Sequence, residues 1–266
     1  MLLAEAAAMN VATLDAELLL QQLTQRSRTQ LRAFDEAPVD ALTAAMFRVA
    51  AQRRAAGEPL AYITGTREFW SMALVVTPAV LVPRPETEML VELCLAHWDA
   101  TPRRIADLGT GSGAIALALA GERPDWQIIA TDASAAALEV AAINRQRLQQ
   151  PQLVLRLGSW CDALGETDFD AIVSNPPYVA ASHPALRDLA YEPLSALTAA
   201  DDGYADLFTI AATARRHLKP GGLLLLEHGA DQAARLQQHL AALGYSAIRC
   251  HRDLAGLDRV TAAIWP

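Results

Sequence analysis

From residue 103 onward, short apolar runs of strand character alternate with longer segments of helical character. This alternation predicts an α/β fold with a parallel, doubly wound sheet. The expected strands are Ile105–Leu108, Trp126–Thr131, Leu153–Leu157, Phe169–Ser174, Leu223–Glu227, Ala247–His251 and Val260–Trp265. The expected helices are Ala114–Leu119, Ala135–Gln149, Tyr204–His217 and Ala230–Leu243. Because only a short link joins the last two strands, we expect them to form an antiparallel hairpin at one edge.

The first 65 residues have a different pattern, which is typical of a small bundle of amphipathic helices. Within the expected helix Val39–Ala56, the side chains of Leu42, Met46 and Val49 share one apolar face. That face could serve for packing or for binding a partner. We therefore expect residues 1–65 to form an N-terminal helical bundle that binds a substrate protein.

Between the two patterns lies a segment of strand character. Phe69–Val76 and Ala79–Val82 indicate a short hairpin around Thr77-Pro78. The stiff, charged run Pro83-Arg84-Pro85-Glu86-Thr87-Glu88 follows, and it could be a plain linker or part of a site. We thus expect a hairpin and proline-containing linker over 66–88 and the α/β domain over 89–266.

Composition excludes several classes of protein. Hydrophobic residues make up 52% of the 266 residues, so a sizeable core is available. The net charge of −8 argues against broad binding to a phosphate backbone. The three cysteines, Cys94, Cys161 and Cys250, are far apart, so we expect reduced thiols and no metal site. Because the N-terminus lacks a basic segment and no apolar run approaches membrane-spanning length, we expect a soluble, cytoplasmic protein.

The expected strand over Phe169–Ser174 runs directly into Asn175-Pro176-Pro177-Tyr178. Two consecutive prolines cannot extend a central strand, because each lacks the N–H that pairs with a neighbour. The chain must therefore leave the sheet at Asn175, at the edge where ligands bind in open α/β sheets. The Asn175 amide and the proline carbonyls suit a planar target that carries an NH2 group, with Tyr178 as an aromatic wall. Alternatively, Asn175 merely ends the strand and the prolines form a stiff turn.

A glycine-rich loop follows the first expected strand of the sheet. In Asp107-Leu108-Gly109-Thr110-Gly111-Ser112-Gly113, the glycines permit a tight turn and a close approach to a ligand. Asp132 ends the second strand, where an acidic side chain accepts hydrogen bonds from ribose hydroxyls. Asp132 could instead cap the next helix, but Ser134 can fill that role.

Two more residues distinguish among nucleoside ligands. Asp107 is a carboxylate where dinucleotide-binding proteins usually carry an apolar residue, and it could face a cationic amino-acid tail or its own surroundings. Trp160 follows the third strand and could lie against an adenine ring or pack in the core.

Taken together, these motifs resemble those of one family. The pattern consists of Gly65–Trp70, Pro83–Glu88, Asp107–Gly113 with Asp132, Asn175–Tyr178 and Glu227-His228-Gly229. It is similar to the HemK/PrmC family of bacterial release-factor glutamine methyltransferases and covers nearly the whole chain. The resemblance implies a class I methyltransferase (Rossmann-like) sheet with an antiparallel edge hairpin, preceded by a small helical domain.

The resemblance also implies a reaction and its residues. S-adenosyl-L-methionine would be the methyl donor, S-adenosyl-L-homocysteine the product, and no metal would be needed. The cofactor would be held by Asp107, Gly109, Thr110, Gly111, Ser112, Gly113, Asp132, Trp160 and Asn175. Asn175, Pro176 and Tyr178 would be catalytic, and Asn175, Pro176, Pro177 and Tyr178 would bind the substrate. That substrate would be the glutamine of the Gly-Gly-Gln loop in class I peptide chain release factors, and we expect the enzyme to be a monomer.

Three other readings of the motifs remain. A DNA or RNA amino-methyltransferase would use the same kind of pocket on adenine N6 or cytosine N4. The net negative charge argues against it. Six arginines of the N-terminal region could contact RNA, but they could equally meet a ribosome-related protein or simply face solvent, which is the default: Arg26, Arg28, Arg32, Arg48, Arg53 and Arg54. A second reading is an assembly factor that binds the cofactor without catalysis. A third is an NAD dehydrogenase, for which no hydride-transfer site is evident.

Overall fold

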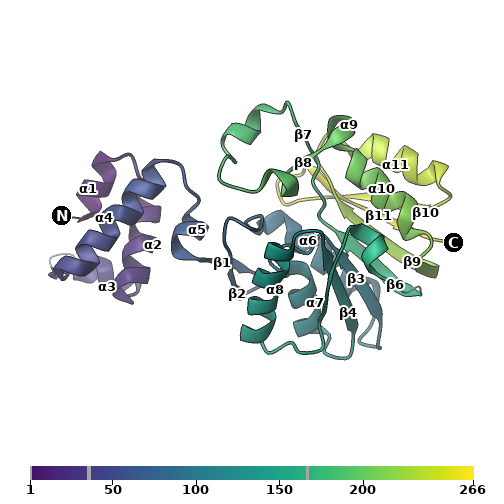
Figure 1. Ribbon diagram of the computed structural model, residues 1–266, viewed down its shortest axis with the longest axis horizontal. Helices are drawn as coiled ribbons and strands as arrows, with labels where there is room; N and C mark the ends of the chain where they lie inside the picture. Colours follow the sequence, from purple (N-terminus) through teal and green to yellow (C-terminus); the bar gives the residue numbers. More distant parts are fainter. Residues whose placement is uncertain (1, 35–36, 166–167) are drawn as a thin grey trace. The chain divides into compact units, whose positions relative to one another are not determined.

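The computed structural model of the protein describes residues 2–34, 37–165 and 168–266. Packing divides the chain into two compact units, residues 1–66 and 67–266. The helices of the first unit (Figure 1) are α1 (Leu2–Ala8), α2 (Thr13–Thr24), α3 (Arg28–Ala33), α4 (Ala41–Ala55) and α5 (Leu60–Thr64). Their shared core consists of Leu2, Ala6, Val11, Ala16, Leu19, Leu20, Phe47 and Ala51.

Helix α4 turns only a narrow face toward this core. Phe47 and Ala51 are wholly buried, whereas Leu42, Met46 and Val49 are each at least half exposed. The apolar face expected from the sequence is therefore a surface feature within this unit and not part of its core. We refer to Leu42, Met46 and Val49 as the α4 stripe.

Five of the six arginines of the first unit are paired with carboxylates of the same unit. Arg28 and Arg32 both contact the buried Glu17, with N···O distances of 2.6 and 2.9 Å. The other pairs are Arg48 with Glu5, Arg53 with Glu58, and Arg54 with Asp15. These five guanidinium groups therefore offer little unopposed charge to a phosphate backbone.

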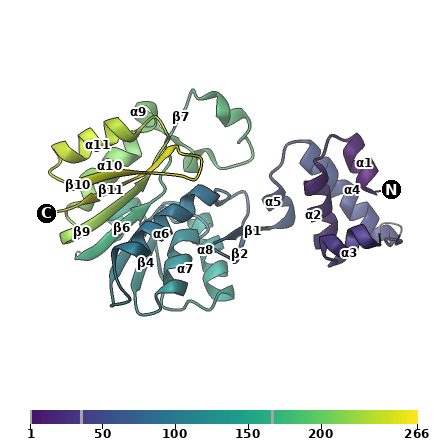
Figure 2. The same ribbon diagram turned by 180° about the vertical axis from the view of Figure 1, so that it is seen from behind.

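The second unit is built around a seven-stranded sheet in the order β10-β11-β9-β6-β3-β4-β5. Its strands are β3 (Arg104–Leu108), β4 (Gln127–Asp132), β5 (Val154–Leu157), β6 (Phe169–Ser174), β9 (Leu218–Glu227), β10 (Ser246–Arg252) and β11 (Asp258–Ile264). The five strands from β5 to β9 in that order pair in parallel. Strand β11 runs antiparallel between β9 and β10 (Figure 2). The predicted doubly wound sheet with an antiparallel edge pair is confirmed.

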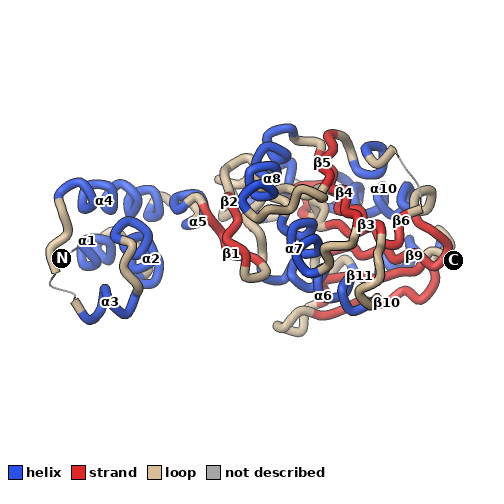
Figure 3. The backbone as a smooth tube through the Cα atoms, turned by 90° about the horizontal axis from the view of Figure 1, so that it is seen from below, coloured by secondary structure: helices blue, strands red, loops and turns tan. Residues whose placement is uncertain are grey.

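Helices cover both faces of the sheet, whose strands are red in Figure 3. One face carries α6 (Glu88–His97), α7 (Ala114–Glu122) and α8 (Ala135–Arg147), and the other carries α10 (Ala205–Ala214) and α11 (Ala233–Ala242). Shorter elements complete the unit: β7 (Val179–Ala180), β8 (Thr198–Ala199), α9 (Ala200–Gly203), and the 3-10 helices η1 (Pro85–Thr87), η2 (Trp160–Ala163), η3 (Pro184–Arg187) and η4 (Leu194–Ala196). None of the helices in the described part of the chain is long and apolar enough to cross a membrane.

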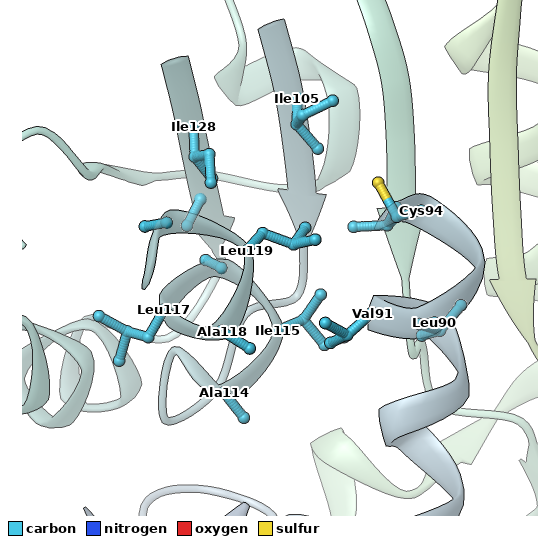
Figure 4. Packing of buried hydrophobic residues seen from close by; sticks show 14 of the residues in the cluster. Leu90, Val91, Cys94, Ile105, Ala114, Ile115, Leu117, Ala118, Leu119 and Ile128 are labelled. Carbon is cyan, nitrogen blue, oxygen red and sulfur yellow. The ribbon is translucent and has the colours of Figure 1, made fainter. Parts of the chain in front are cut away.

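Alternate residues of each central strand pack into two separate cores, one on each face of the sheet. Ile105 of β3 packs with α6 and α7, and its neighbour Ala106 packs with α10 and α11. Figure 4 shows Val91 of α6 and Ile115 of α7 side by side in the first core. Burial on both faces explains why these strands read as continuous apolar runs in the sequence.

The short hairpin lies closer to the N-terminus than the sequence predicts. Its strands are β1 (Thr66–Phe69) and β2 (Met72–Val75), and the turn is Trp70-Ser71. Both turn residues have positive φ, 50° and 56°. Neither is a glycine or asparagine, so composition gave no sign of the turn. Residues 79–82 do not form a strand; they lie in a loop, in which the side chains of Val80 and Val82 are buried.

Asn144 of α8 joins this hairpin to the glycine-rich loop. It is 1% exposed, and its Nδ2 donates to the carbonyls of Val75 and Ser112, both at 2.9 Å. Its Oδ1 accepts from the Val75 N–H at 2.7 Å. One buried side chain thus satisfies three backbone groups.

We predict that Asn144→Ala lowers the free energy of unfolding by about 3 kcal/mol, because three backbone groups lose their partner. Urea denaturation measures the change. Gln146→Ala, on an exposed position of the same helix, is the matched control and should change stability by less than about 0.5 kcal/mol. An Asn144 variant as stable as this control would contradict the prediction.

Candidate active site

The carboxyl ends of β3, β4 and β6 meet at one edge of the sheet. Leu108 pairs with Thr131 of β4 on one side and with Ser174 of β6 on the other. The segments that follow these three strands are therefore brought together, although they are far apart in sequence. A cavity of about 440 Å³ lies at this edge.

Most of the predicted site residues line this cavity. Those on its wall are Gly109, Thr110, Gly111, Ser112, Asp132, Trp160, Asn175 and Pro177. Four others are not among the residues that line it: Asp107, Gly113, Pro176 and Tyr178. In addition, the structure brings the segment 79–87, residues 193–196 and Asp206 to the cavity.

The glycine-rich loop is shaped by its backbone. Gly109 and Gly111 have φ of 71° and 55°, in the left-handed region that favours glycine. The N–H groups of Gly109 and Thr110 both donate to the Thr131 carbonyl at 2.9 Å. A Cβ on Gly109 would lie 3.0 Å from the Trp160 ring, so this glycine lets the indole lie against the loop. A Cβ on Gly113 would meet Leu117 instead, which gives that glycine a packing role.

Asp107 supports the loop from beneath. It is fully buried, and its Oδ2 accepts from the Thr110 hydroxyl at 2.7 Å and from the Ala116 N–H at 3.2 Å. Its Oδ1 is buried without a hydrogen-bond partner among the described residues. Burial raises the pKa of Asp107 to about 7. Asp107 therefore holds the loop in shape and does not itself form the cavity wall.

Asp132 lies on the wall with both oxygens already engaged. Oδ2 accepts from the Gly111 N–H at 2.9 Å, and Oδ1 accepts from the Ser134 N–H at 2.8 Å. As predicted, Ser134 caps α8, through a bond from the Ala137 N–H. The carboxylate is thus not left free, but each oxygen keeps acceptor capacity for a ligand hydroxyl.

Trp160 meets an acidic residue that sequence reasoning missed. Asp206, near the start of α10, lines the cavity beside Trp160. Burial raises the pKa of Asp206, and a hydrogen bond from Trp160 opposes this rise. The only available signal was an acidic residue in the first turn of a helix, which is common in proteins.

Asn175 is held by the proline-containing connector. Its Nδ2 donates to Thr87 Oγ1 at 3.1 Å, across 88 positions of sequence. Pro83, Arg84 and Thr87 all line the cavity, so this segment is part of the site and not a plain linker. Among the described residues, no hydrogen bond occupies Asn175 Oδ1. The amide oxygen is thus the group that Asn175 offers to the cavity.

The connector is tied to the chain that follows the prolines. Glu192, 5% exposed, accepts from the Val82 N–H at 2.9 Å and forms an ion pair with Arg84. Glu192 precedes Pro193, which also lines the cavity. No motif marked Glu192, because its partners lie more than a hundred positions away.

Tyr178, expected as an aromatic wall, is not among the residues that line the cavity. After the prolines the chain enters β7, and the Tyr178 hydroxyl donates to Glu227 Oε1 of β9 at 3.1 Å. Burial raises the pKa of the phenol above its usual range. Tyr178 therefore contacts a buried carboxyl behind the wall.

Comparison with known proteins identifies the family. Residues 2–65 match the model of the PrmC N-terminal domain, and residues 85–192 match that of the methyltransferase small domain. A release factor glutamine methyltransferase from Coxiella burnetii is 48% identical over 94% of this chain and 91% of its own length. The chain belongs to the release factor glutamine methyltransferase family. A member from Escherichia coli is 46% identical over 93% of this chain and 90% of its own.

A solved structure agrees on the fold. A methyltransferase from Pyrococcus furiosus superimposes with a TM-score of 0.55 and 19% identity, over 72% of this chain and 88% of that one. The class I methyltransferase fold expected from the family motifs is thereby confirmed.

The residues at the cavity fit the cofactor of this family. Gly111 lies on the cavity wall and a Cβ built on it would meet no atom within 4 Å, so the loop leaves open space there, and Asp132 offers acceptors for hydroxyl groups. The Trp160 ring supplies a flat apolar surface. This combination suits a nucleoside. No group of three or more His, Cys, Asp or Glu in the described ranges is arranged to hold a metal ion.

Asp107 generates a prediction about stability. Its pKa is about 7 in the fold and 3.8 ordinarily, so the folded protein binds this proton more tightly than the unfolded chain. The free energy of unfolding should therefore fall as pH rises through this window, by up to about 1.4 kcal/mol per pH unit. We predict that Asp107→Asn removes this slope, since asparagine carries no titrating proton.

Urea denaturation of both proteins at several pH values between those two pKa values measures the effect. The buried Glu227 also has a pKa of about 7, but it is present in both proteins and cancels in the difference. A constant difference in stability across the window would contradict the prediction.

Proposed function

We propose that this protein transfers a methyl group from S-adenosyl-L-methionine to the side-chain amide nitrogen of glutamine in a class I peptide chain release factor. The target is the glutamine of the Gly-Gly-Gln loop, and its methylation tunes translation termination. The observation that carries the proposal is the Asn175 amide, which is held through Nδ2 and offers its oxygen to the cavity. Family membership supports the same substrate.

The cofactor would be held by three groups of residues. The loop Gly109–Ser112 would lie against the methionine part, with Asp132 at the ribose hydroxyls and Trp160 at the adenine ring. When bound, S-adenosyl-L-methionine supplies an electrophilic methyl group on a sulfonium centre. The transfer needs no metal ion from the protein.

The role of Asn175 and Pro176 follows from amide chemistry. An amide nitrogen is a weak nucleophile because its lone pair is delocalised into the carbonyl. Donation of its two hydrogens to Asn175 Oδ1 and the Pro176 carbonyl would orient the nitrogen and raise its electron density. Neither proline has an N–H that competes for these acceptors. Alignment alone can contribute roughly 7–11 kcal/mol in ideal cases. The proton departs after transfer, and we assign no general base.

Charge argues against the nucleic-acid alternative. An amino group on adenine or cytosine would suit Asn175 equally well. However, the chain carries a net charge of −8, and five arginines of the helical unit are paired with carboxylates. A protein substrate places no such demand on charge. We propose that the enzyme acts on it as a monomer in the cytoplasm.

The helical unit would supply a docking surface for the release factor. Its α4 stripe exposes three large apolar side chains within one unit, and contiguous exposed apolar residues mark interaction sites. A partner that covers this stripe would gain hydrophobic stabilisation. This assignment gives residues 1–65 the substrate-binding role expected of them.

We predict that label from S-adenosyl-L-methionine enters a purified class I release factor but not the same factor with its loop glutamine changed to alanine. Unmethylated DNA and RNA should remain unlabelled. Asn175→Ala should lower kcat at least about a hundredfold, because the substrate amide loses an acceptor in the transition state. Its Kd for the cofactor should stay within about twofold of the wild type.

Asp132→Ala is the matched control and should weaken cofactor binding instead. Label in nucleic acid would overturn the assigned substrate. Equal losses of cofactor affinity in the Asn175 and Asp132 variants would overturn the role of Asn175.

We further predict that Leu42→Glu combined with Met46→Glu raises the KM for the release factor about tenfold, because charge on the α4 stripe must be desolvated on docking. The cofactor Kd should not change. Ile143→Glu, which adds charge at an exposed apolar position of α8, is the control. A KM equal to that of the control would contradict the docking role.

A further inference from the structure

A short chain of polar groups leads from Asn175 into the protein. Asn175 Nδ2 donates to Thr87 Oγ1, and the Thr87 hydroxyl faces the Glu227 carboxyl. Thr87 comes from the connector and Glu227 from the end of β9, so three distant segments meet here. The proposed chemistry at the cavity uses Thr87 only as the anchor of Asn175 and leaves Glu227 without a role.

Glu227 is buried and incompletely bonded. It is 1% exposed, and its Oε1 accepts from the Tyr178 hydroxyl at 3.1 Å. Its Oε2 has no hydrogen bond of regular geometry among the described residues. The Thr87 hydroxyl, which faces this carboxyl, is a donor that can satisfy it by rotation of its hydrogen.

The direction of each hydrogen bond in the chain is set by its neighbour. A threonine hydroxyl has one hydrogen, so a hydroxyl that donates to Glu227 can only accept from Asn175. An amide that donates from Nδ2 to Thr87 must turn Oδ1 away from it. A carboxylate at Glu227 therefore selects one of the two possible orientations of the Asn175 side chain.

We propose that Thr87 and Glu227 are positioning residues for methyl transfer, which hold the Asn175 amide with its oxygen toward the substrate. This inference rests on the proposed function of Asn175. A carboxylate at Glu227 keeps the Thr87 oxygen an acceptor, and Thr87 in turn anchors Asn175 Nδ2. Tyr178 contributes from the other side, because its hydroxyl occupies Glu227 Oε1.

Protonation of Glu227 would reverse the direction of the hydrogen bonds that link Glu227, Thr87 and Asn175. A protonated carboxyl must donate its hydrogen, and Thr87 Oγ1 is an acceptor that faces it. The Thr87 hydrogen then turns to Asn175, where it competes with Nδ2. The productive orientation is thereby lost at low pH.

The surroundings of Glu227 place this change near neutrality. Burial is the largest influence and raises the pKa of Glu227 to about 7. Glu86 of η1 raises it further, whereas the hydroxyls of Thr87 and Tyr178 and the charge of Arg259 on β11 lower it. Methyl transfer should therefore rise with pH through this region.

The test is a comparison of kcat, KM and cofactor Kd in full-length variants between about pH 6 and 9. Thr87→Val should lower kcat about tenfold or more with the cofactor Kd within about twofold. Thr87→Ser, which restores the hydroxyl, should recover kcat to within about threefold of the wild type. Thr261→Val is the matched control, because this buried hydroxyl of β11 contacts His228 and not Asn175, and it should leave kcat near the wild-type value.

The pH profile distinguishes positioning from mere packing. Glu227→Gln should lower kcat and abolish its decline toward acid pH. Tyr178→Phe removes a donor that favours the carboxylate, so the decline should move to higher pH. Asp107 has a similar pKa, but it supports the glycine-rich loop, so its titration should affect the cofactor Kd rather than kcat.

Three outcomes would overturn the proposal: wild-type kcat in Thr87→Val, failure of Thr87→Ser to recover activity, or an unchanged acid decline in Glu227→Gln. Should a variant fail to fold, the wild-type protein still permits a test. The side-chain NH2 signals of Asn175 in NMR spectra, assigned by their loss in Asn175→Ala, should shift with a midpoint near the pKa of Glu227. Signals that do not respond to pH would contradict the coupling.

This NMR titration needs no substrate. If wild-type enzyme fails to methylate the release factor, the proposed function is wrong. The coupling between Glu227 and Asn175 is then still judged by the titration alone.

Discussion

The parallel pairing of β3 with β4 and β6 is the constraint on which the candidate active site, at the carboxyl edge of the sheet, depends. It sets Leu108, Thr131 and Ser174 at one level, and the Ser174 hydroxyl donates to the Leu108 carbonyl at 2.6 Å. A shift of one residue would exchange the two faces of a strand, so that its side chains would enter the wrong one of the two cores. The two prolines end β6 at this level, so Asn175 emerges beside the glycine-rich loop. The register of the three strands thus places the segments that form the site next to one another, independently of the contacts that their side chains make.

Two buried carboxyls flank the cavity in a similar way. Asp107 at the end of β3 accepts from Thr110, and Glu227 at the end of β9 faces Thr87. Both threonines lie on the cavity wall, so each hydroxyl connects a buried acid to the surface that meets a ligand. Burial of a carboxyl opposes folding at neutral pH. Buried carboxyls that oppose folding in this way are expected at functional sites.

Much of this arrangement could be predicted, because strands buried on both faces read as apolar runs and Pro176 must end one of them. The turn at Trp70-Ser71 could not be predicted, since residues of these types seldom adopt positive φ. The face of α4 was ambiguous because Phe47 and Ala51 are as apolar as the α4 stripe, and only packing against α1 and α2 selects between them.

The partners of Asn175 could not be predicted for a related reason. Thr87 lies 88 positions earlier, and an ordinary threonine in a charged run has no feature that distinguishes it. Hydrogen bonds between distant segments are decided by the three-dimensional fold, and one sequence alone contains no record of them. The sequence motifs predicted residues that line the cavity, whereas the residues that orient them, such as Thr87, could be identified only from the structure.

The single amide oxygen that Asn175 offers has a consequence for the product. Under the proposed function, the substrate amide arrives with two hydrogens and meets two acceptors, Asn175 Oδ1 and the Pro176 carbonyl. After transfer and loss of a proton, the nitrogen carries one hydrogen and a methyl group. One acceptor then faces a methyl group and loses its hydrogen bond. The site therefore binds its product less tightly than its substrate, which favours release after one turnover and limits each glutamine to a single methyl group.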